Sequence, residues 1–376
     1  MNTKRIKLIV SAALITSIVV MPNFFGGTII KADAAVVGGY SYAKVSNESK
    51  TVVRSLAELE KAFKEHKHHI VVSGYISAGN TIKTFTFADT SWNNFTIEGE
   101  AGGKAVLENI QLKFDGEMLS GDTNISNIVV KNITFRGNIS TLQKLKGADT
   151  QPGGIGTNYM GVSFRRTTNA LIDHCTIFDT SDDLTCVTLG SDKITFQYCH
   201  FYFSDSWAKM NPNPMWNWVG KNQDLASERL AMVIGANRND SYEYGGKKLH
   251  VTLHHNWFGP NMKGRPLVRG FVHEYNNYFD NSTGKTDQYN ANQIGSGSVI
   301  YSEANYFYKT NQSNQVGLDK TSDSHKFYER NNIYNGTTGK SEKGASFPGN
   351  TNFGYSYLAE NASLVPKDVQ TNAGPK

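Results

Sequence analysis

One lysine and two arginines lie close together in the sequence Lys263-Gly-Arg-Pro-Leu-Val-Arg269. Arg265 and Arg269 lie in an otherwise apolar, strand-like stretch. Guanidinium groups at this spacing suit a carboxylate ligand, because each can donate two parallel hydrogen bonds to it. A charge cluster that protects the edge of a sheet is the alternative explanation for the same residues.

Three carboxylates follow a strand-like run in a turn rich in Ser, Thr and Asp: Asp179, Asp182 and Asp183. Such a group could hold calcium or take part in acid–base catalysis. Aspartate also caps polar turns without any further role, so the pattern alone does not require a site.

Two insertions interrupt the strand-like pattern, at residues 136–159 and 207–228. Insertions in a repeat protein tend to gather on one face, which is often the binding face. The second insertion contains Trp207, Trp216 and Trp218, which could stack on sugar rings or simply anchor the loop.

Histidines and cysteines give no short zinc-binding motif. Strict alternation along a strand places His254 and His255 on opposite sides, so they are not expected to share one inward site. Cys175 and Cys199 have the same phase in the repeat described below. Their equivalent positions predict two free thiols stacked in the core, with a single disulfide between Cys175 and Cys199 as the alternative.

A short sequence motif that recurs along the chain predicts the elements that position these residues. In each copy, a small polar residue is followed two positions later by a large apolar residue. Successive copies are 24, 57, 21, 28 and 27 residues apart, and the second spacing is about two periods. A strand-like repeat of this length predicts a coiled stack of parallel strands, in which equivalent residues lie above one another. The ladder residues are Cys175, Cys199, Asn256, Asn277, Asn305 and Asn332.

The repeat predicts one all-β domain over residues 35–376, a parallel β-helix. The pattern Ser55-Leu-Ala-Glu58 is a capping box and predicts a short helix from residue 56 to residue 63 or 65, placed to close the first coil. Strands are expected at residues 70–76, 95–97, 106–114 and 128–135. The turn-rich tail from residue 344 is expected to wrap a flank.

The first 34 residues have the pattern of a secretory signal peptide, with a basic start, an apolar run over residues 8–20 and the small-residue site Ala32-Asp-Ala34. We expect cleavage after Ala34 and a secreted, extracellular protein without a membrane span. The net charge of +5 includes +3 from residues 1–34, which leaves about +2 on the remainder. So small a charge gives no reason to expect nucleic acid as a partner.

Four motifs in one order resemble those of the pectate lyase and pectin lyase family of polysaccharide lyases. They are Ala170-Leu-Ile-Asp-His-Cys175, Gly190-Ser-Asp-Lys-Ile-Thr195, Val251-Thr-Leu-His-His-Asn256, and Arg265-Pro-Leu-Val-Arg269 followed by His273-Glu-Tyr-Asn-Asn277. The resemblance covers about residues 125–335. It implies a right-handed parallel β-helix that cleaves homogalacturonan by β-elimination and works as a monomer.

The resemblance also implies site residues, and this chain departs from several of them. The family binds calcium through acidic residues whose positions fall here on Met160, Asp182 and Cys186, and the glycine of the same pattern is Asp183. Met and Cys suit an oxygen-seeking ion poorly. The family's substrate lysine falls on Ser206, with Lys209 as a stand-in.

The arginine motif is shifted relative to the family, because Arg265 directly precedes Pro266. We assign Arg265 as the base that removes the C5 proton, Arg269 as the clamp on the uronate carboxylate and Lys263 as the reserve base. An arginine base predicts an alkaline optimum, because its resting form is protonated.

The departures favour a calcium-independent pectin lyase, with a calcium-dependent pectate lyase as the alternative in which Asp182, Asp183 and Asp179 hold the ion. Arg165 and Arg166 point oppositely on a strand, so at most one of them can fill the former calcium position. Two further readings remain. One is a hydrolase of the polygalacturonase kind that uses Asp182 and Asp183, and the other is a β-helix that binds polysaccharide without cleaving it.

Overall fold

The computed structural model describes residues 38–145, 159–211, 229–240, 249–264, 266–284, 289–316 and 324–376. These residues belong to one compact unit, Ala32–Lys376. The expected signal peptide at residues 1–34 lies outside the described residues. No helix in the described part of the chain is long and apolar enough to span a membrane.

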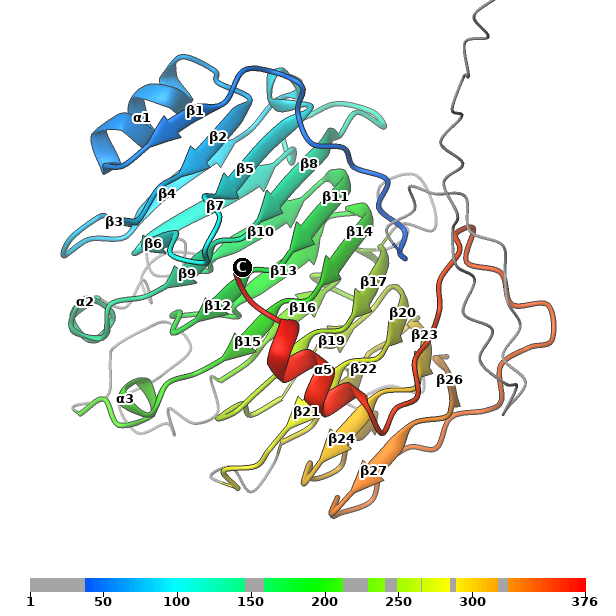
Figure 1. The fold of residues 1–376 in the computed structure, drawn as a ribbon. Helices are drawn as coiled ribbons and strands as arrows, with labels where there is room; N and C mark the ends of the chain where they lie inside the picture. The colour runs from blue at the N-terminus through cyan, green and yellow to red at the C-terminus, as the bar shows by residue number, and fades with distance from the viewer. Residues whose placement is uncertain are drawn as a thin grey trace, which may run out of the picture. The chain divides into compact units, whose positions relative to one another are not determined.

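Within the described ranges, the strands form three parallel sheets, here called A, B and C (Figure 1). Sheet A contains β1 (Thr51–Val53), β2 (His69–Val72), β5 (Phe95–Gly99), β8 (Ile125–Lys131), β11 (Thr167–Asp173), β14 (Asp192–Gln197), β17 (His250–His254), β20 (Phe271–Tyr275), β23 (Val299–Glu303) and β26 (Lys326–Arg330). Sheet B contains β3 (Tyr75–Ser77), β6 (Val106–Glu108), β9 (Thr134–Arg136), β12 (Thr176–Phe178), β15 (His200–Tyr202), β18 (Trp257–Phe258), β21 (Tyr278–Asp280), β24 (Tyr306–Tyr308) and β27 (Ile333–Asn335). Sheet C contains β4 (Lys83–Phe87), β7 (Ile110–Asp115), β10 (Val162–Arg165), β13 (Thr185–Thr188), β16 (Met232–Ile234), β19 (Leu267–Val268), β22 (Asn292–Ile294) and β25 (Asn314–Val316).

Each coil passes from sheet C to sheet A and then to sheet B, and every strand pairs in parallel with its equivalent in the next coil. This is the right-handed parallel β-helix that the repeat and the resemblance predicted. The expected strands at residues 95–97, 106–114 and 128–135 correspond to β5, to β6 with β7, and to β8 with β9.

The turn from sheet A to sheet B is built on the predicted ladder. Asn277 is fully buried, and its Oδ1 accepts hydrogen bonds of 3.0 Å from both the backbone N–H and Nδ2 of Asn256. Its Nδ2 donates to Asn305 Oδ1 at 3.0 Å, and the backbone N–H of Asn305 donates to Asn332 Oδ1 at 2.9 Å. The ladder therefore satisfies the polar groups of each turn through the coil above or below it.

The residue before each ladder position has a left-handed backbone, as at His174 (φ 49°), Tyr198 (φ 49°) and His255 (φ 54°). A single left-handed residue turns the chain sharply between two strands. It also breaks strand alternation, so the expectation that His254 and His255 face opposite sides is wrong. Their Nδ1 atoms lie 2.9 Å apart.

The interval of 57 residues between Cys199 and Asn256 is one coil, which corrects the expectation of two. Strand β15 pairs directly with β18, with His200 opposite Trp257. The extra length lies between β15 and β16, where the sequence carries the insertion at residues 207–228. A spacing alone cannot distinguish an inserted loop from an omitted copy of the repeat.

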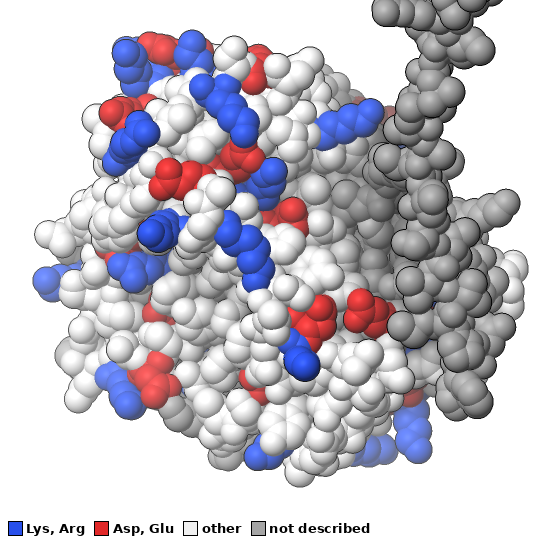
Figure 2. Space-filling model, in the orientation of Figure 1, with Lys and Arg blue, Asp and Glu red and all other residues white. Residues whose placement is uncertain are grey.

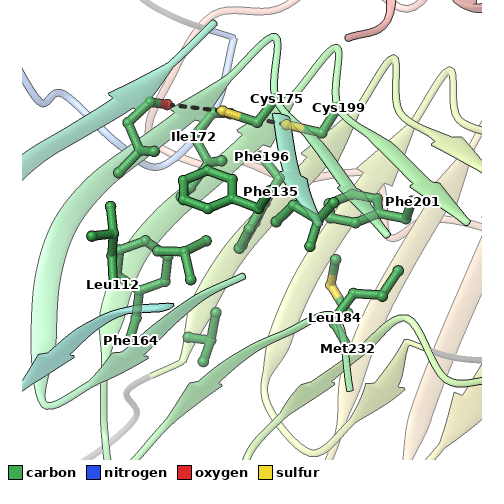
Figure 3. Packing of buried hydrophobic residues seen from close by; sticks show 14 of the residues in the cluster. Leu112, Phe135, Phe164, Ile172, Cys175, Leu184, Phe196, Cys199, Phe201 and Met232 are labelled. Atoms are coloured by element: carbon green, nitrogen blue, oxygen red, sulfur yellow. Dashed lines mark hydrogen bonds between the residues drawn. The ribbon is translucent and has the colours of Figure 1, made fainter. Parts of the chain in front are cut away.

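Large apolar side chains fill the inside of the coil (Figure 3). One stack of aromatic rings runs through sheet B, with centroids 5.1 Å apart for Phe201 and Phe258, 4.9 Å for Phe258 and Phe279, and 4.8 Å for Phe279 and Phe307. Cys175 and Cys199 are buried free thiols in neighbouring coils. This confirms stacked core thiols over a disulfide.

Helix α1 (Leu56–Lys64) begins at Ser55, whose hydroxyl accepts a hydrogen bond from the Glu58 N–H at 3.2 Å. Its apolar face buries Leu59 and Phe63, and the Phe63 ring contacts Phe87 in the first coils. The helix thus closes the open end of the core, as the capping box predicted (Figure 1). In the described part of the chain the remaining helices are the 3-10 turn η1 (Thr90–Trp92), α2 (Ile139–Lys144), α3 (Asp205–Ala208) and α5 (Val365–Asn372).

The tail lies along the outside of the coil, as expected. Tyr355 donates to or accepts from Thr252 Oγ1 at 3.0 Å, and the backbone N–H of Gly374 donates to the Tyr198 carbonyl at 2.8 Å. Val365 and Val369 of α5 are buried in a small cluster with Trp257. Figure 2 shows basic and acidic side chains interspersed on this face.

Candidate active site

A cleft of about 400 Å³ lies on the outer face of sheet C. The register aligns Ser163, Cys186, Val233 and Leu267 on neighbouring strands, and alternation turns this row outward while Val187 and Ile234 enter the core. The cleft is lined by Met160, Arg165, Asp182, Asp183, Cys186, Thr188, Leu230, Val233, Ala236, Leu267 and Arg269.

Arg165 presents its guanidinium at this cleft from the end of β10. Its Nε donates to Asp115 Oδ1 at 3.1 Å, and its Nη2 pairs with Glu117. Burial alone would raise the pKa of Asp115, but hydrogen bonds and charge from Lys113 and Arg165 outweigh it and lower the pKa. The pair therefore stays ionised and holds Arg165 in place.

Arg166 points away from the cleft, which confirms that only one of the two arginines faces it. Its backbone is left-handed (φ 45°), and its side chain donates to the carbonyls of Leu119, Gly121 and Thr123. Only 5% of the residue is exposed. Arg166 therefore holds a loop, and its expected role in substrate binding is wrong.

Asp182 and Asp183 both line the cleft, in the turn between β12 and β13. Asp182 Oδ1 accepts a hydrogen bond from the Asp183 N–H at 2.8 Å. Their neighbours there include Met160 and Cys186. Burial raises the pKa of the Cys186 thiol to about 12, so this residue is not a thiolate at neutral pH.

This donor set does not fit a calcium site of the family kind. Calcium takes about six to eight oxygen ligands. Here two carboxylates share the cleft with a thioether, a neutral thiol and the Arg165 guanidinium. A cation at this position would meet the positive charge of Arg165, so we derive no step of the chemistry through calcium.

The structure separates Asp179 from the other two carboxylates. It lines a second pocket of about 390 Å³ together with Glu108, Arg136 and Ser204, at the ends of sheet B strands and in the loops after them. Its carboxylate accepts hydrogen bonds from the Ser204 N–H at 2.8 Å and the Ser204 hydroxyl at 2.6 Å. Burial raises the pKa of Asp179 to about 6, against the opposing effect of these bonds.

Arg269 lies at the cleft immediately after β19, and its guanidinium donates to the Gly235 carbonyl at 2.8 Å. Lys263 is half-buried and is not among the residues that line the cleft. Arg265 lies outside the described residues, as do Trp216 and Trp218. Of the three expected cationic residues, the structure thus places Arg269 directly at the cleft.

Gly235 makes room for Arg269, and we expect Gly235→Ala to reduce activity more than stability. A Cβ at Gly235 would lie 2.8 Å from Arg269 Cβ, and the backbone there has φ 96°. Displacing Arg269 should lower kcat/KM about 10-fold to 100-fold, because a shift of about 1 Å misplaces the guanidinium. Steady-state kinetics on methyl-esterified homogalacturonan, the substrate that the sequence favours, test this.

Gly121→Ala is the matched control. Gly121 also has a left-handed backbone (φ 59°), but a Cβ there meets no atom within 4 Å. This variant carries similar backbone strain of about 1 kcal/mol without touching the cleft. Equal losses of kcat/KM in the two variants would show that strain, and not the position of Arg269, causes the effect.

Trp207 is a core residue, and its expected stacking on sugar is wrong. It is fully buried, and its indole N–H donates to the Thr180 carbonyl at 2.8 Å. Lys209 is exposed one turn later, with its Nζ 3.9 Å from Asp205 Oδ2. It lines neither the cleft nor the second pocket.

Sequence reasoning missed Asp115 and Gly235. Asp115 pairs with Arg165 across neighbouring coils, a register that only the structure gives. Its signal was present in the sequence, since Asp115 follows an alternating run as Arg165 does. No sequence pattern marks Gly235 as a site residue, because its importance depends on Arg269, which lies 34 positions later.

The fold and the cleft define a parallel β-helix with arginines and carboxylates on one sheet. A family model described as pectate lyase matches residues 217–376. Curated relatives include a pectate lyase 1 of Hesperocyparis arizonica, 31% identical over 57% of this chain and 52% of the relative. A pectate lyase of Bacillus subtilis is 25% identical over 65% of this chain and 54% of the relative. The chain thus spans about half the length of these relatives.

Solved structures share the fold over nearly the whole chain. A pectate lyase from Bacillus sp. N165, in complex with trigalacturonate, superposes with a TM-score of 0.63 at 18% identity and covers 90% of this chain and 98% of that one. Pectate lyase C from Erwinia chrysanthemi, with calcium, has a TM-score of 0.61 at 15% identity and covers 91% and 97%. In sequence the chain is thus similar to pectate lyases, and in fold it resembles solved pectate lyase structures.

Proposed function

We propose that this protein is an exported polysaccharide lyase that cleaves homogalacturonan by β-elimination. The observation that supports the proposal is the cleft on sheet C, which is lined by Arg165 and Arg269 and also by Asp182 and Asp183. Two guanidinium groups suit a polymer that carries a carboxyl or ester group on every sugar. The similarity of residues 217–376 to the pectate lyase family model and the trigalacturonate complex of a structural neighbour support the same substrate class.

In the proposed reaction, a base removes the proton at C5 of the uronate, the C4–O bond breaks, and the leaving oxygen takes up a proton. The products are a new reducing end and an unsaturated uronate with a C4–C5 double bond. Arg269, fixed by its hydrogen bond to the Gly235 carbonyl, binds the carboxyl group next to C5 and stabilises the charge that develops there. We assign the base to Arg265, although the motif is shifted relative to the family, with Lys263 in reserve.

We propose that the reaction does not need calcium and favours methyl-esterified polymer. Arg165 supplies positive charge in the cleft, and the Met160 and Cys186 side chains replace oxygen donors. A methyl ester carries no charge, so the apolar wall formed by Val233 and Leu267 suits it better than it suits a carboxylate.

Arg165→Gln tests this role. The change removes the charge but keeps a hydrogen-bonding side chain, and it should raise KM on the polymer about 10-fold, the loss expected for one charge-assisted hydrogen bond. Steady-state kinetics on methylated homogalacturonan measure the effect, with Lys209→Gln as the control, because Lys209 is exposed and outside the cleft. If both variants raise KM equally, general electrostatic attraction explains binding and Arg165 has no specific role.

The activity itself is tested by the absorbance of unsaturated uronate, released from homogalacturonan by the purified protein. A lyase breaks the bond without adding water and forms an unsaturated product, whereas a hydrolase adds water and forms no double bond. Reducing ends without ultraviolet absorbance would instead support the hydrolase.

A further inference from the structure

Three side chains that could bind a metal ion meet beside the C-terminal helix, away from sheet C. His255 comes from the turn between β17 and β18, Glu360 from the tail and Asp368 from α5. One ligand atom of each lies within 4.8 Å of the other two. Figure 1 shows α5 lying across the coil beside β21, where Val365 and Val369 pack with Tyr278 and Trp257.

His255 is held so that Nε2 faces the two carboxylates. Its Nδ1 lies 2.9 Å from His254 Nδ1, and its ring stacks on Tyr198 with centroids 4.8 Å apart. The residue is only 7% exposed. Nε2 lies 4.0 Å from Glu360 Oε1, beyond hydrogen-bonding distance, so the two groups are close without being hydrogen-bonded to each other.

The carboxylates in the cluster lack a compensating cation. Asp368 Oδ1 accepts a hydrogen bond from Asn372 at 2.7 Å, but the buried Oδ2 has no partner. Among the residues that the structure describes, no lysine or arginine forms an ion pair with Glu360 or Asp368. Two acidic groups and one imidazole thus face one another without a positive partner.

We propose that His255, Glu360 and Asp368 bind a divalent transition-metal ion of the zinc class. Imidazole nitrogen and carboxylate oxygen are both zinc ligands, and water would complete a four-coordinate site with these three side chains. Zinc bonds of about 2.0–2.2 Å place ligand atoms about 3.3 Å apart. Because Glu360 is exposed and lies on the tail, its side chain can move closer. Calcium fits less well, since it prefers six or more oxygens.

The ion would fasten the C-terminal segment to the coil. His255 belongs to the β-helix turn, while Glu360 and Asp368 belong to the segment that covers it, and no covalent link joins them otherwise. Binding to the folded protein alone would then raise Tm. The site is independent of the lyase reaction, so its test does not depend on the proposed function.

The test is isothermal titration of zinc chloride into the full, tag-free protein after treatment with EDTA and dialysis. We expect one saturable site in the wild type, weakened at least about 10-fold in both His255→Gln and Asp368→Asn. Zinc at about 100 times its Kd should raise Tm by about 4 °C. Excess calcium should leave the zinc titration unchanged.

The matched control is Glu342→Gln. His325 Nε2 lies 3.9 Å from Glu342 Oε1, so this pair has the same two groups as His255 and Glu360 without the third ligand. Its removal should not change the zinc affinity. No saturable zinc binding in the wild type, or unchanged affinity in both His255→Gln and Asp368→Asn, would overturn the proposal. If His255→Gln does not fold, Asp368→Asn gives the same answer, because Asp368 lies in the outer helix α5.

Discussion

Replacing Arg265 with alanine is expected to lower kcat by about 10³-fold while KM on the polymer changes by less than about 10-fold. A positioned base contributes about 10²–10⁴ in rate, and its loss affects the transition state more than the ground state. The measurement is steady-state release of unsaturated uronate. Circular dichroism and Tm of the variant must match those of the wild type.

Lys263→Ala separates the two candidates for the base. Lys263 does not line the cleft, so this variant should keep kcat within about 10-fold of the wild type. If Lys263→Ala removes activity and Arg265→Ala does not, the base is Lys263 and the arginine assignment is wrong. A third variant, Arg265→Lys, should retain some activity with an optimum at lower pH, because lysine loses its proton more readily than arginine.

Replacing Glu274 with glutamine is expected to stabilise the protein more at pH 8 than at pH 5. The difference in free energy of unfolding, variant minus wild type, should be about 3 kcal/mol larger at pH 8. Glu274 is fully buried on β20, and Asn292 donates to its Oε1 at 2.6 Å. Its Oε2 has no hydrogen-bond partner. Burial raises the pKa of Glu274 from 4.5 to about 7, against the hydrogen bonds from Ser302 and Asn292.

The sign follows from proton binding. Between pH 4.5 and 7 the folded protein binds more protons at Glu274 than the unfolded chain does, so the wild type loses stability as pH rises through this window. Glutamine carries no charge and removes the loss. Urea unfolding at pH 5, 6, 7 and 8 gives the free energies, and parallel curves for the two proteins would contradict the prediction.

Glu303→Gln is the control with the opposite sign. Glu303 is also buried in sheet A, but Arg330 Nε donates to its Oε1 at 2.6 Å and the Tyr357 hydroxyl donates to its Oε2 at 2.7 Å. Burial would raise the pKa of Glu303, but hydrogen bonds from His273, Arg330 and Tyr357 outweigh it and lower the pKa to about 2. This variant should therefore lose stability at pH 8.

The fold could be predicted because each coil repeats the same physical problem. A buried turn needs a polar side chain to satisfy its backbone, so Asn256, Asn277 and Asn305 return at one phase. The same argument failed between Cys199 and Asn256, where the 57-residue interval is a single long coil and not two coils. Nothing in the sequence shows whether extra residues form a coil or a loop until the pairing of β15 with β18 is known.

The site was harder to predict because it depends on which way single residues point. The sequence placed Arg165, Asp182, Asp183 and Arg269 in one region, and the structure brings all four to the cleft. It could not show that Trp207 enters the core, since a tryptophan in an insertion has no periodic pattern to define its face.

A left-handed residue caused one further error. His255 has φ 54°, which breaks the alternation on which its face was predicted. The meeting of His255 with Glu360 and Asp368, across more than 100 residues of sequence, could not be foreseen for the same reason.

The central claim is that the cleft on sheet C supports calcium-independent β-elimination of homogalacturonan. It is tested most directly by the absorbance of unsaturated uronate from de-esterified and highly methylated polymer, each with added calcium or with chelator. We expect a signal on the methylated polymer that resists chelator. A signal only on de-esterified polymer with calcium would contradict our account of the donor set, and no signal on either polymer would leave a β-helix that binds polysaccharide without cleaving it.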